Sequence, residues 1–138
     1  MSFKDISQIA GSAMAAQTVR LNTVASNLAN ADSVAGSENE TYRARKPVFA
    51  AVMNEGLDPS AGGRVQVLDV VQSAEPLRRV YEPDNPLANA EGVVFYPNVN
   101  QVAEMTDMMS ASRAFETNVE VLGRIRGMQQ SLLKLGEG

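Results

Sequence analysis

The 138-residue sequence contains no histidine, no cysteine and no tryptophan, and aromatic residues make up only 5% of it. Without His and Cys, the commonest general base, metal ligand and strong nucleophile of enzymes are missing. The lack of Cys also excludes disulfide bonds, and the shortage of aromatic residues leaves little bulk for a large globular core. These absences argue against an enzyme, and we expect no catalytic residues, no metal site, no cofactor and no small-molecule substrate.

Positive charge and long apolar runs are also scarce. The 12 Lys and Arg residues are outnumbered by 16 Asp and Glu residues, which gives a net charge of −4. Nucleic-acid binding depends on clustered cations, so we expect no nucleic-acid partner. No apolar run approaches the roughly 18 residues that mark a membrane span. The start of the chain, where Asp5 follows Lys4, lacks the basic leader and apolar segment of a secretory signal.

The longest regular pattern covers residues 100–135, where apolar residues recur at helical spacing. They form two stripes, one of Met105, Met108, Phe115, Val119 and Leu122 and one of Val121, Ile125, Met128, Leu132 and Leu135. Asn98 and Asn100 are candidate N-caps, and we expect the helix to stop at Gly136. At about 1.5 Å per residue, this predicts a helix roughly 50 Å long.

Residues 2–31 predict a second long helix, which begins at an approximate capping box formed by Ser2 and Asp5. Its apolar face consists of Phe3, Ala10, Met14, Leu21, Val24 and Leu28. Across residues 6–31 the only charged residue is Arg20, and the other polar positions are neutral amides and hydroxyls. Burying such groups avoids the large cost of desolvating a charge. We therefore expect a helix that is buried on several sides rather than a disordered arm.

Between the helices, the composition is typical of a loop at 32–40 and then of short strands. Residues 48–53 form a short apolar run, and strands are predicted around Val65 and Val67, with Val71 as a further candidate, at 77–81 and at 92–97. Turn-forming residues fill 54–63 and place Gly62 and Gly63 in a hairpin-like turn.

These patterns predict a mainly α fold with a small β-rich insert. The long N- and C-terminal helices are expected to pair as an antiparallel coiled-coil-like hairpin. The predicted division of the chain is an N-terminal helix at 1–33, a loop and β-rich insert at 34–97, and a C-terminal helix of the same helical domain at 98–138.

Glu104 and Asp107 lie three residues apart on one face of the final helix, as acid pairs in some catalytic and metal sites do. We expect instead that they form a solvated first turn, in which negative charge complements the helix dipole.

A two-helix hairpin cannot cover both stripes of the final helix and the stripe of the first helix at once. Each large apolar side chain contributes about 1.5–3 kcal/mol when it is buried, so association with other copies or partners is favoured. Gly123 and Gly127, four residues apart, could clear a groove for close helix contact. Alternatively, they are two tolerated glycines that cost about 1 kcal/mol each. The residues expected to carry helix packing and assembly are Phe3, Met14, Leu21, Val24, Leu28, Met105, Phe115, Val119, Leu122, Gly123, Ile125, Gly127 and Leu132.

Four ordered runs carry a family resemblance: 25–33 (ASNLANADS), 85–88 (NPLA), 97–99 (PNV) and 109–122 (MSASRAFETNVEVL). Together they resemble the bacterial flagellar rod, hook and hook-associated axial proteins, and in particular the proximal-rod members of that family. Tyr42 departs from the wider family pattern, because it follows the insert 34–40 and has no preceding Gly, which is similar to the proximal-rod type. The residues that carry the motif are Asn27, Leu28, Ala29, Asn30, Tyr42, Asn85, Pro86, Pro97 and Asn98.

The resemblance implies a structural subunit that stacks helically into the rod, which crosses the periplasm of the flagellar basal body, transmits torque and surrounds the export channel. Implied partners are further copies, other rod proteins, the export-gate and ring components, and the flagellar type III apparatus, which would export the chain without a cleaved signal peptide. In such a subunit, Asn27 and Asn30 are expected to satisfy buried backbone groups near the helix end. The alternative is an adaptor that docks one partner through an amphipathic helix and forms a finite complex.

Overall fold

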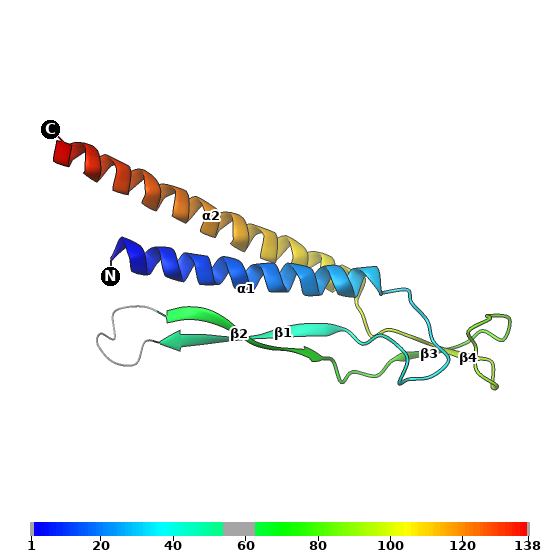
Figure 1. Cartoon of the computed structure of the whole chain (residues 1–138). Helices are drawn as coiled ribbons and strands as arrows, with labels where there is room; N and C mark the ends of the chain where they lie inside the picture. The colour runs from blue at the N-terminus through cyan, green and yellow to red at the C-terminus, as the bar shows by residue number, and fades with distance from the viewer. Residues whose placement is uncertain (1, 54–62, 138) are drawn as a thin grey trace.

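The computed structural model describes residues 2–53 and 63–137. In chain order, its elements are α1 (Phe3–Ala29), β1 (Arg45–Met53), β2 (Gly63–Gln72), β3 (Arg78–Tyr81), β4 (Val93–Tyr96) and α2 (Gln101–Glu137). The two helices lie side by side and antiparallel, so both chain ends lie at one end of an elongated molecule (Figure 1). The predicted pair of long terminal helices, with a small β region between them, is confirmed.

α1 begins at the predicted capping box. The Ser2 hydroxyl accepts a hydrogen bond from the Asp5 backbone N–H at 3.2 Å, and the Asp5 carboxylate accepts one from the Ser2 backbone N–H at 2.9 Å. These reciprocal bonds satisfy two backbone donors that no helical carbonyl can reach. At the other end, the Asn30 amide donates to the Ser26 carbonyl at 2.9 Å, which satisfies one of the last carbonyls of the helix.

α2 has 37 residues and is ten residues longer than α1. Of the two candidate N-caps, Asn100 takes the role, because its side-chain oxygen accepts from the Ala103 N–H at 3.2 Å. The expected stop at Gly136 is wrong, since α2 continues to Glu137. A glycine inside a helix costs about 1 kcal/mol but does not by itself end the helix. Neither α1 nor α2 is apolar enough over a sufficient length to cross a membrane.

β1 and β2 form an antiparallel hairpin whose register runs from Arg45 opposite Gln72 to Met53 opposite Gly63, with a bulge between Val48 and Phe49. α1 contacts this hairpin and also contacts α2, so α1 lies between the two (Figure 1). The prediction that the first helix is covered on several sides is therefore confirmed. Of the predicted glycine turn, Gly62 lies outside the described residues and Gly63 begins β2.

β3 and β4 form a second antiparallel pair, which lies beyond the end of the helices where α2 begins (Figure 1). Ala35 forms an isolated antiparallel bridge with Phe95 of β4. Its N–H bonds to the Phe95 carbonyl at 3.2 Å, and its carbonyl accepts from the Phe95 N–H at 2.8 Å. Gly92 makes the tight turn before β4 with a φ of +75°, in the left-handed region that favours glycine. The predicted strands at 77–81 and 92–97 thus exist and pair with each other.

The core of the chain is thin and consists mostly of Ala and Val side chains. Among the described residues, no Leu, Met or Phe is buried. The largest fully buried side chains are those of Val24, Val94 and Asn27, and the other buried apolar residues are Ala10, Ala16, Ala31, Ala44, Val93, Ala111 and Ile125. The shortage of bulk that the composition indicates is therefore also a property of the folded chain.

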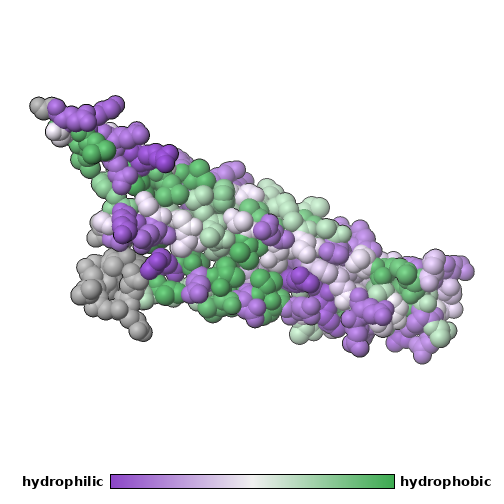
Figure 2. Space-filling view, viewed as in Figure 1, coloured by the Kyte–Doolittle hydropathy of each residue, from purple (hydrophilic) through white to green (hydrophobic). Residues whose placement is uncertain are grey.

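Large apolar side chains lie instead on the outer faces of α2 and of the β1–β2 hairpin (Figure 2). On the hairpin the exposed set is Val48, Phe49, Val52, Met53, Leu68, Val70 and Val71, and on α2 it is Val102, Met105, Met109, Val119, Met128, Leu132, Leu133 and Leu135. α1 exposes no large apolar side chain in its described length. Its exposed stripe consists of Lys4, Gln8, Gly11, Ala15, Thr18, Asn22, Ala25 and Ala29, all of them uncharged except Lys4.

We predict that Gly92→Ala lowers the free energy of unfolding by about 2 kcal/mol. The new Cβ would lie 2.9 Å from Cε2 of Tyr81 and 3.2 Å from Cβ of Pro83, at a φ that L-residues rarely adopt. The measurement is urea unfolding followed by circular dichroism. As the matched control, Gly11→Ala lies in α1 with open space around it, and should instead stabilise the chain by up to about 1 kcal/mol. Equal unfolding midpoints for the Gly92 variant and the original chain would contradict the prediction.

Candidate functional site

Asn27 forms a buried polar junction between α1 and the start of β1. Its side-chain oxygen accepts from the Arg45 backbone N–H at 2.9 Å and from the Tyr42 hydroxyl at 2.7 Å. Its amide donates to the Arg45 carbonyl at 2.9 Å. The Tyr42 hydroxyl also lies 3.1 Å from the Ser26 hydroxyl, and the guanidinium of Arg45 stacks over the Tyr42 ring. Two residues of the predicted motif, Asn27 and Tyr42, are thus brought together.

Asn98 ties the two ends of the hairpin to the start of α2. Its side-chain oxygen accepts from the Ala44 N–H at 2.7 Å, and its amide donates to the Glu75 carbonyl at 2.8 Å. The Ser73 N–H closes the arrangement by donating to the Ala44 carbonyl at 2.7 Å. Asn98 was expected as an N-cap or a motif residue, and the structure gives it this bridging position between three segments.

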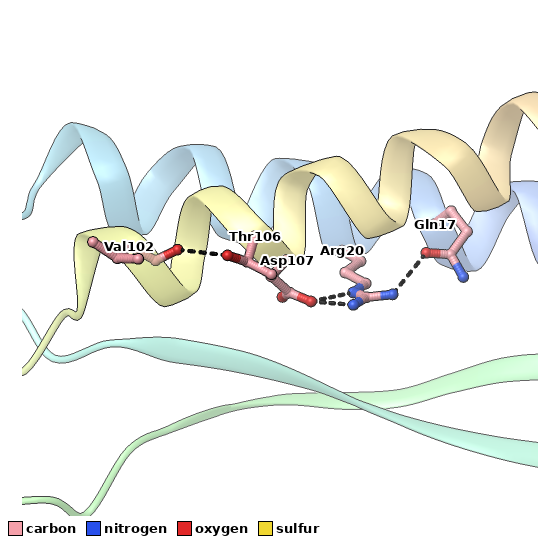
Figure 3. A network of polar contacts seen from close by, with 5 residues as sticks. All are labelled: Gln17, Arg20, Val102, Thr106 and Asp107. Carbon is pink, nitrogen blue, oxygen red and sulfur yellow. Dashed lines mark hydrogen bonds and ion pairs between the residues drawn. The ribbon is translucent and has the colours of Figure 1, made fainter.

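An ion pair joins the two helices at Arg20, which is the only charged residue of α1 beyond its first turn (Figure 3). Its guanidinium donates to Oδ1 of Asp107 from Nε, at 2.9 Å, and from Nη2. Nη1 donates to the Gln17 side chain at 3.4 Å. The side chain of Arg20 is 23% exposed and that of Asp107 is 40% exposed, so the pair is only partly shielded from solvent. A directional contact of this kind fixes the register of α1 against α2.

Glu104, one turn before Asp107, contradicts the expected solvated turn. It is only 9% exposed, and its Oε2 is fully enclosed without accepting a hydrogen bond from the described part of the chain. Glu104 and Asp107 share one face of α2, and the ion pair of Asp107 with Arg20 shows that this face meets α1. The sequence alone does not show which face of α2 meets α1. The expectation fails because burial is decided by the neighbouring helix rather than by distance from the helix end.

A second polar cluster holds the β3–β4 end together. The Glu82 carboxylate accepts from the Asn85 amide at 3.0 Å and from the Tyr96 hydroxyl at 2.9 Å. The hydrogen bond from Asn85, followed by that from Tyr96, lowers the pKa of Glu82 below its usual range. The hydrogen bond to Glu82 raises the pKa of Tyr96. The guanidinium of Arg78 lies 4.4 Å from the centre of the Tyr96 ring. Asn85, a motif residue, therefore lies in this cluster and not at the Asn27 junction.

The remaining expected residues are distributed over core and surface. Of the packing set, Val24 and Ile125 are buried, and the half-buried members are Phe3, Met14, Leu21, Leu28, Phe115 and Leu122. Its exposed members are Met105, Val119, Leu132, Gly123 and Gly127. A Cβ added at either glycine would meet nothing within 4 Å, so no close helix contact forms there within the described chain. Of the other motif residues, Pro97 is buried, Asn30 is half-buried, and Ala29 and Pro86 are exposed.

Three polar contacts were not predicted from the sequence: Glu82 with Tyr96, Arg45 with Asn27, and Arg20 with Asp107. Nothing in the local pattern links Glu82 to Tyr96, or Arg45 to Asn27, because those contacts span a loop or a strand. The partner of Arg20 could have been sought, since the only charge in residues 6–29 of α1 needs a partner on whatever element covers it.

Comparisons with known proteins agree with the motif positions. Residues 8–36 match the family described as flagella basal body rod protein, and residues 90–135 match the C-terminal family described as flagellar basal body rod FlgEFG protein. The chain is 50% identical over 137 residues to the flagellar basal-body rod protein FlgC of Escherichia coli O157:H7, covering 99% of this chain and all of the relative. It is 49% identical to FlgC of Salmonella typhimurium over the same shares, and 36% identical to FlgC of Bacillus subtilis over 94% of this chain and 95% of that one.

We predict that Asn27→Ala lowers the free energy of unfolding by about 2 kcal/mol, since it removes the side-chain partner of the partly buried N–H and carbonyl of Arg45. Urea unfolding followed by circular dichroism measures the change. Asn30→Ala is the matched control, because the side chain of Asn30 bonds only to a carbonyl of its own helix and its loss should cost about 1 kcal/mol or less. Equal losses for the two variants would show that the junction contributes nothing specific.

Acid should destabilise the chain partly through Glu82. Unfolded glutamate titrates at about pH 4.3, and the pKa of Glu82 is lower in the folded chain. The unfolded state therefore binds more protons, and stability present above that range is lost as the pH falls through the folded pKa. In Glu82→Gln, the urea midpoint should fall less between about pH 5 and about pH 3 than in the original chain. Glu116→Gln, at an exposed acid of α2, is the control, and an acid limb unchanged in Glu82→Gln would contradict the prediction.

Proposed function

Since the chain belongs to the family of the flagellar basal-body rod protein FlgC, and is thus a structural subunit of the flagellar rod, we propose that it polymerises helically with other rod proteins around an export channel. The observation that carries this proposal is the placement of apolar side chains. They lie on the outer faces of α2 and of the β1–β2 hairpin, while the core between those elements consists of small residues.

Two exposed apolar faces on opposite sides of α1 suit several neighbours at once. Burying one large apolar side chain contributes about 1.5–3 kcal/mol. Covering either face in an assembly would therefore bury larger apolar side chains than those that fill the thin core of the isolated chain. An adaptor that docks a single partner in one groove needs only one such face. The arrangement therefore supports a polymer subunit over the adaptor.

The helices would form the axial part of the subunit. In this proposal, residues 1–33 and 98–138 make one helical domain with coiled-coil-like packing, and 34–97 form the insert that packs beside it. The uncharged exposed stripe of α1 and the open glycines Gly123 and Gly127 would then meet helices of neighbouring subunits, where small residues permit close approach.

The proposed location is the rod of the basal body, where it crosses the periplasm. The flagellar type III apparatus would export the chain without cleaving a signal peptide. Its neighbours would be further copies, other rod proteins, and the export-gate and ring components beneath them. We propose no catalysis, no cofactor, no small-molecule substrate and no nucleic-acid partner for this role.

The test uses Leu132→Glu in the bacterium that carries the chain, after deletion of its chromosomal copy. Leu132 is 54% exposed, so a charge there should leave the monomer's urea midpoint unchanged. Its desolvation in an interface should nevertheless prevent rod assembly and abolish swimming, measured by swarm diameter and by recovery of basal bodies. Gln130→Glu adds the same charge two residues away, at an exposed polar position of α2, and is the matched control. Normal swarming of the Leu132 variant would contradict the proposal for this face.

A further inference from the structure

Glu104 borders a hollow of about 660 Å³ that opens between α1, the ends of the hairpin and the first turns of α2. Three carboxylates border this hollow, those of Glu75, Glu104 and Asp107, and two cations do, those of Arg20 and Lys46. Arg20 is already bonded to Asp107. Among the described residues, no ion pair joins Glu104 to Arg20 or to Lys46.

A carboxylate that is 9% exposed, with one enclosed oxygen that accepts no hydrogen bond, is costly in the isolated chain. The dipole of α2 offsets only part of this cost, because it contributes about 0.3–1 kcal/mol near a helix start and is not a hydrogen bond to the oxygen. A residue that serves only the stability of its own chain would be better replaced by an uncharged one. Glu104 therefore fits a site that is completed by something outside the chain.

We propose that the hollow over Glu104 receives an arginine side chain from α2 of a second copy of this chain. The clause of the proposed function on which this rests is that copies pack side by side. Charge complementarity selects the occupant. The acids that border the hollow lie at the start of α2 and at Glu75, whereas the arginines of α2 are exposed further along the same helix, at Arg113, at Arg126 and at Arg124, which also pairs with Glu120.

A contact between the start of α2 in one copy and a later position of α2 in the next joins two different surfaces. Such a heterologous contact repeats from copy to copy and extends an assembly helically, instead of closing a two-fold dimer. Arg is suited to this position, because its guanidinium is always charged and carries several N–H donors, so it can neutralise the Glu104 carboxylate while also bonding to other acceptors that border the hollow. The hollow would thus set the stagger between neighbouring copies.

The experiment places the photo-reactive residue p-benzoylphenylalanine at Ser110, an exposed position that borders the hollow, in cells that assemble flagella with this chain. We expect a covalent dimer of the chain, and mass spectrometry should place the cross-link in the α2 peptide that contains Arg113, Arg124 or Arg126. Cross-links from Ser110 only to a different protein would overturn the proposal. So would an absence of Ser110 cross-links when the same residue at position 132 gives them.

The position-132 probe also separates the two proposals. If neither position gives cross-links, the chain does not pack against neighbours in the rod and the proposed function fails. If only position 132 gives them, the proposed function stands and the inference about Glu104 fails.

Glu104→Gln supplies the chemical test, with Glu116→Gln as the control at an exposed acid of the same helix. Glu104→Gln should lower the yield of the Ser110 dimer about tenfold, while the urea midpoint of the monomer stays the same or rises. The Glu116 variant should change neither quantity. A fall in the monomer midpoint of Glu104→Gln that Lys46→Gln reproduces would overturn the proposal, since Lys46 would then be the partner of Glu104 within the chain.

Discussion

The fold depends on the hydrogen bonds of Asn27, which fix where the β1–β2 hairpin begins on the side of α1. Its side-chain amide bonds to both the N–H and the carbonyl of Arg45, and its oxygen also accepts a hydrogen bond from the Tyr42 hydroxyl. Asn27 is 1% exposed, so its amide oxygen and nitrogen cannot bond to water and would be left unpaired without Arg45 and Tyr42. Asn98 repeats the device at the other side of the same segment by bonding to Ala44 and Glu75. The helices and the hairpin are therefore oriented by directional polar contacts rather than by a large apolar core.

This explains why α1 carries almost no charge. The helix is covered by α2 on one side and by the hairpin on the other, and its Ser12 hydroxyl accepts from the Val65 N–H at 3.1 Å. Charged side chains on either covered face would have to be desolvated, whereas neutral ones can bond to the backbone of the neighbour. Beyond the first turn of α1 the one charged residue is Arg20, which is compensated by Asp107. The neutral polar composition of α1 is thus explained by its position between α2 and the β1–β2 hairpin.

Much of this fold could be predicted from the sequence, because its main elements are long and locally encoded. The periodicity of 100–135, the capping box at Ser2 and the neutral composition of α1 gave two helices and the covered position of the first. Short-range patterns could not identify partners brought together by the fold. Glu104 was misjudged because its burial depends on α1, some 80 residues earlier, and the Asn27 junction was anticipated only as a helix-end contact. The predicted helix end at Gly136 was wrong because a glycine permits a helix to end but does not require it to end there.

The distribution of side chains inverts the usual arrangement of a soluble monomer. Ala, Val and polar side chains, together with Ile125, occupy the inside, whereas Leu, Met and Phe residues remain half-buried or exposed on the described chain. Directional hydrogen bonds specify geometry but contribute only about 1 kcal/mol each to stability, while apolar burial is non-directional and larger. In the assembly that we propose, internal polar contacts set the shape of the subunit and the apolar surface is left for its neighbours. In such an assembly, burial of the exposed apolar side chains against neighbours would stabilise the folded chain as well as the polymer.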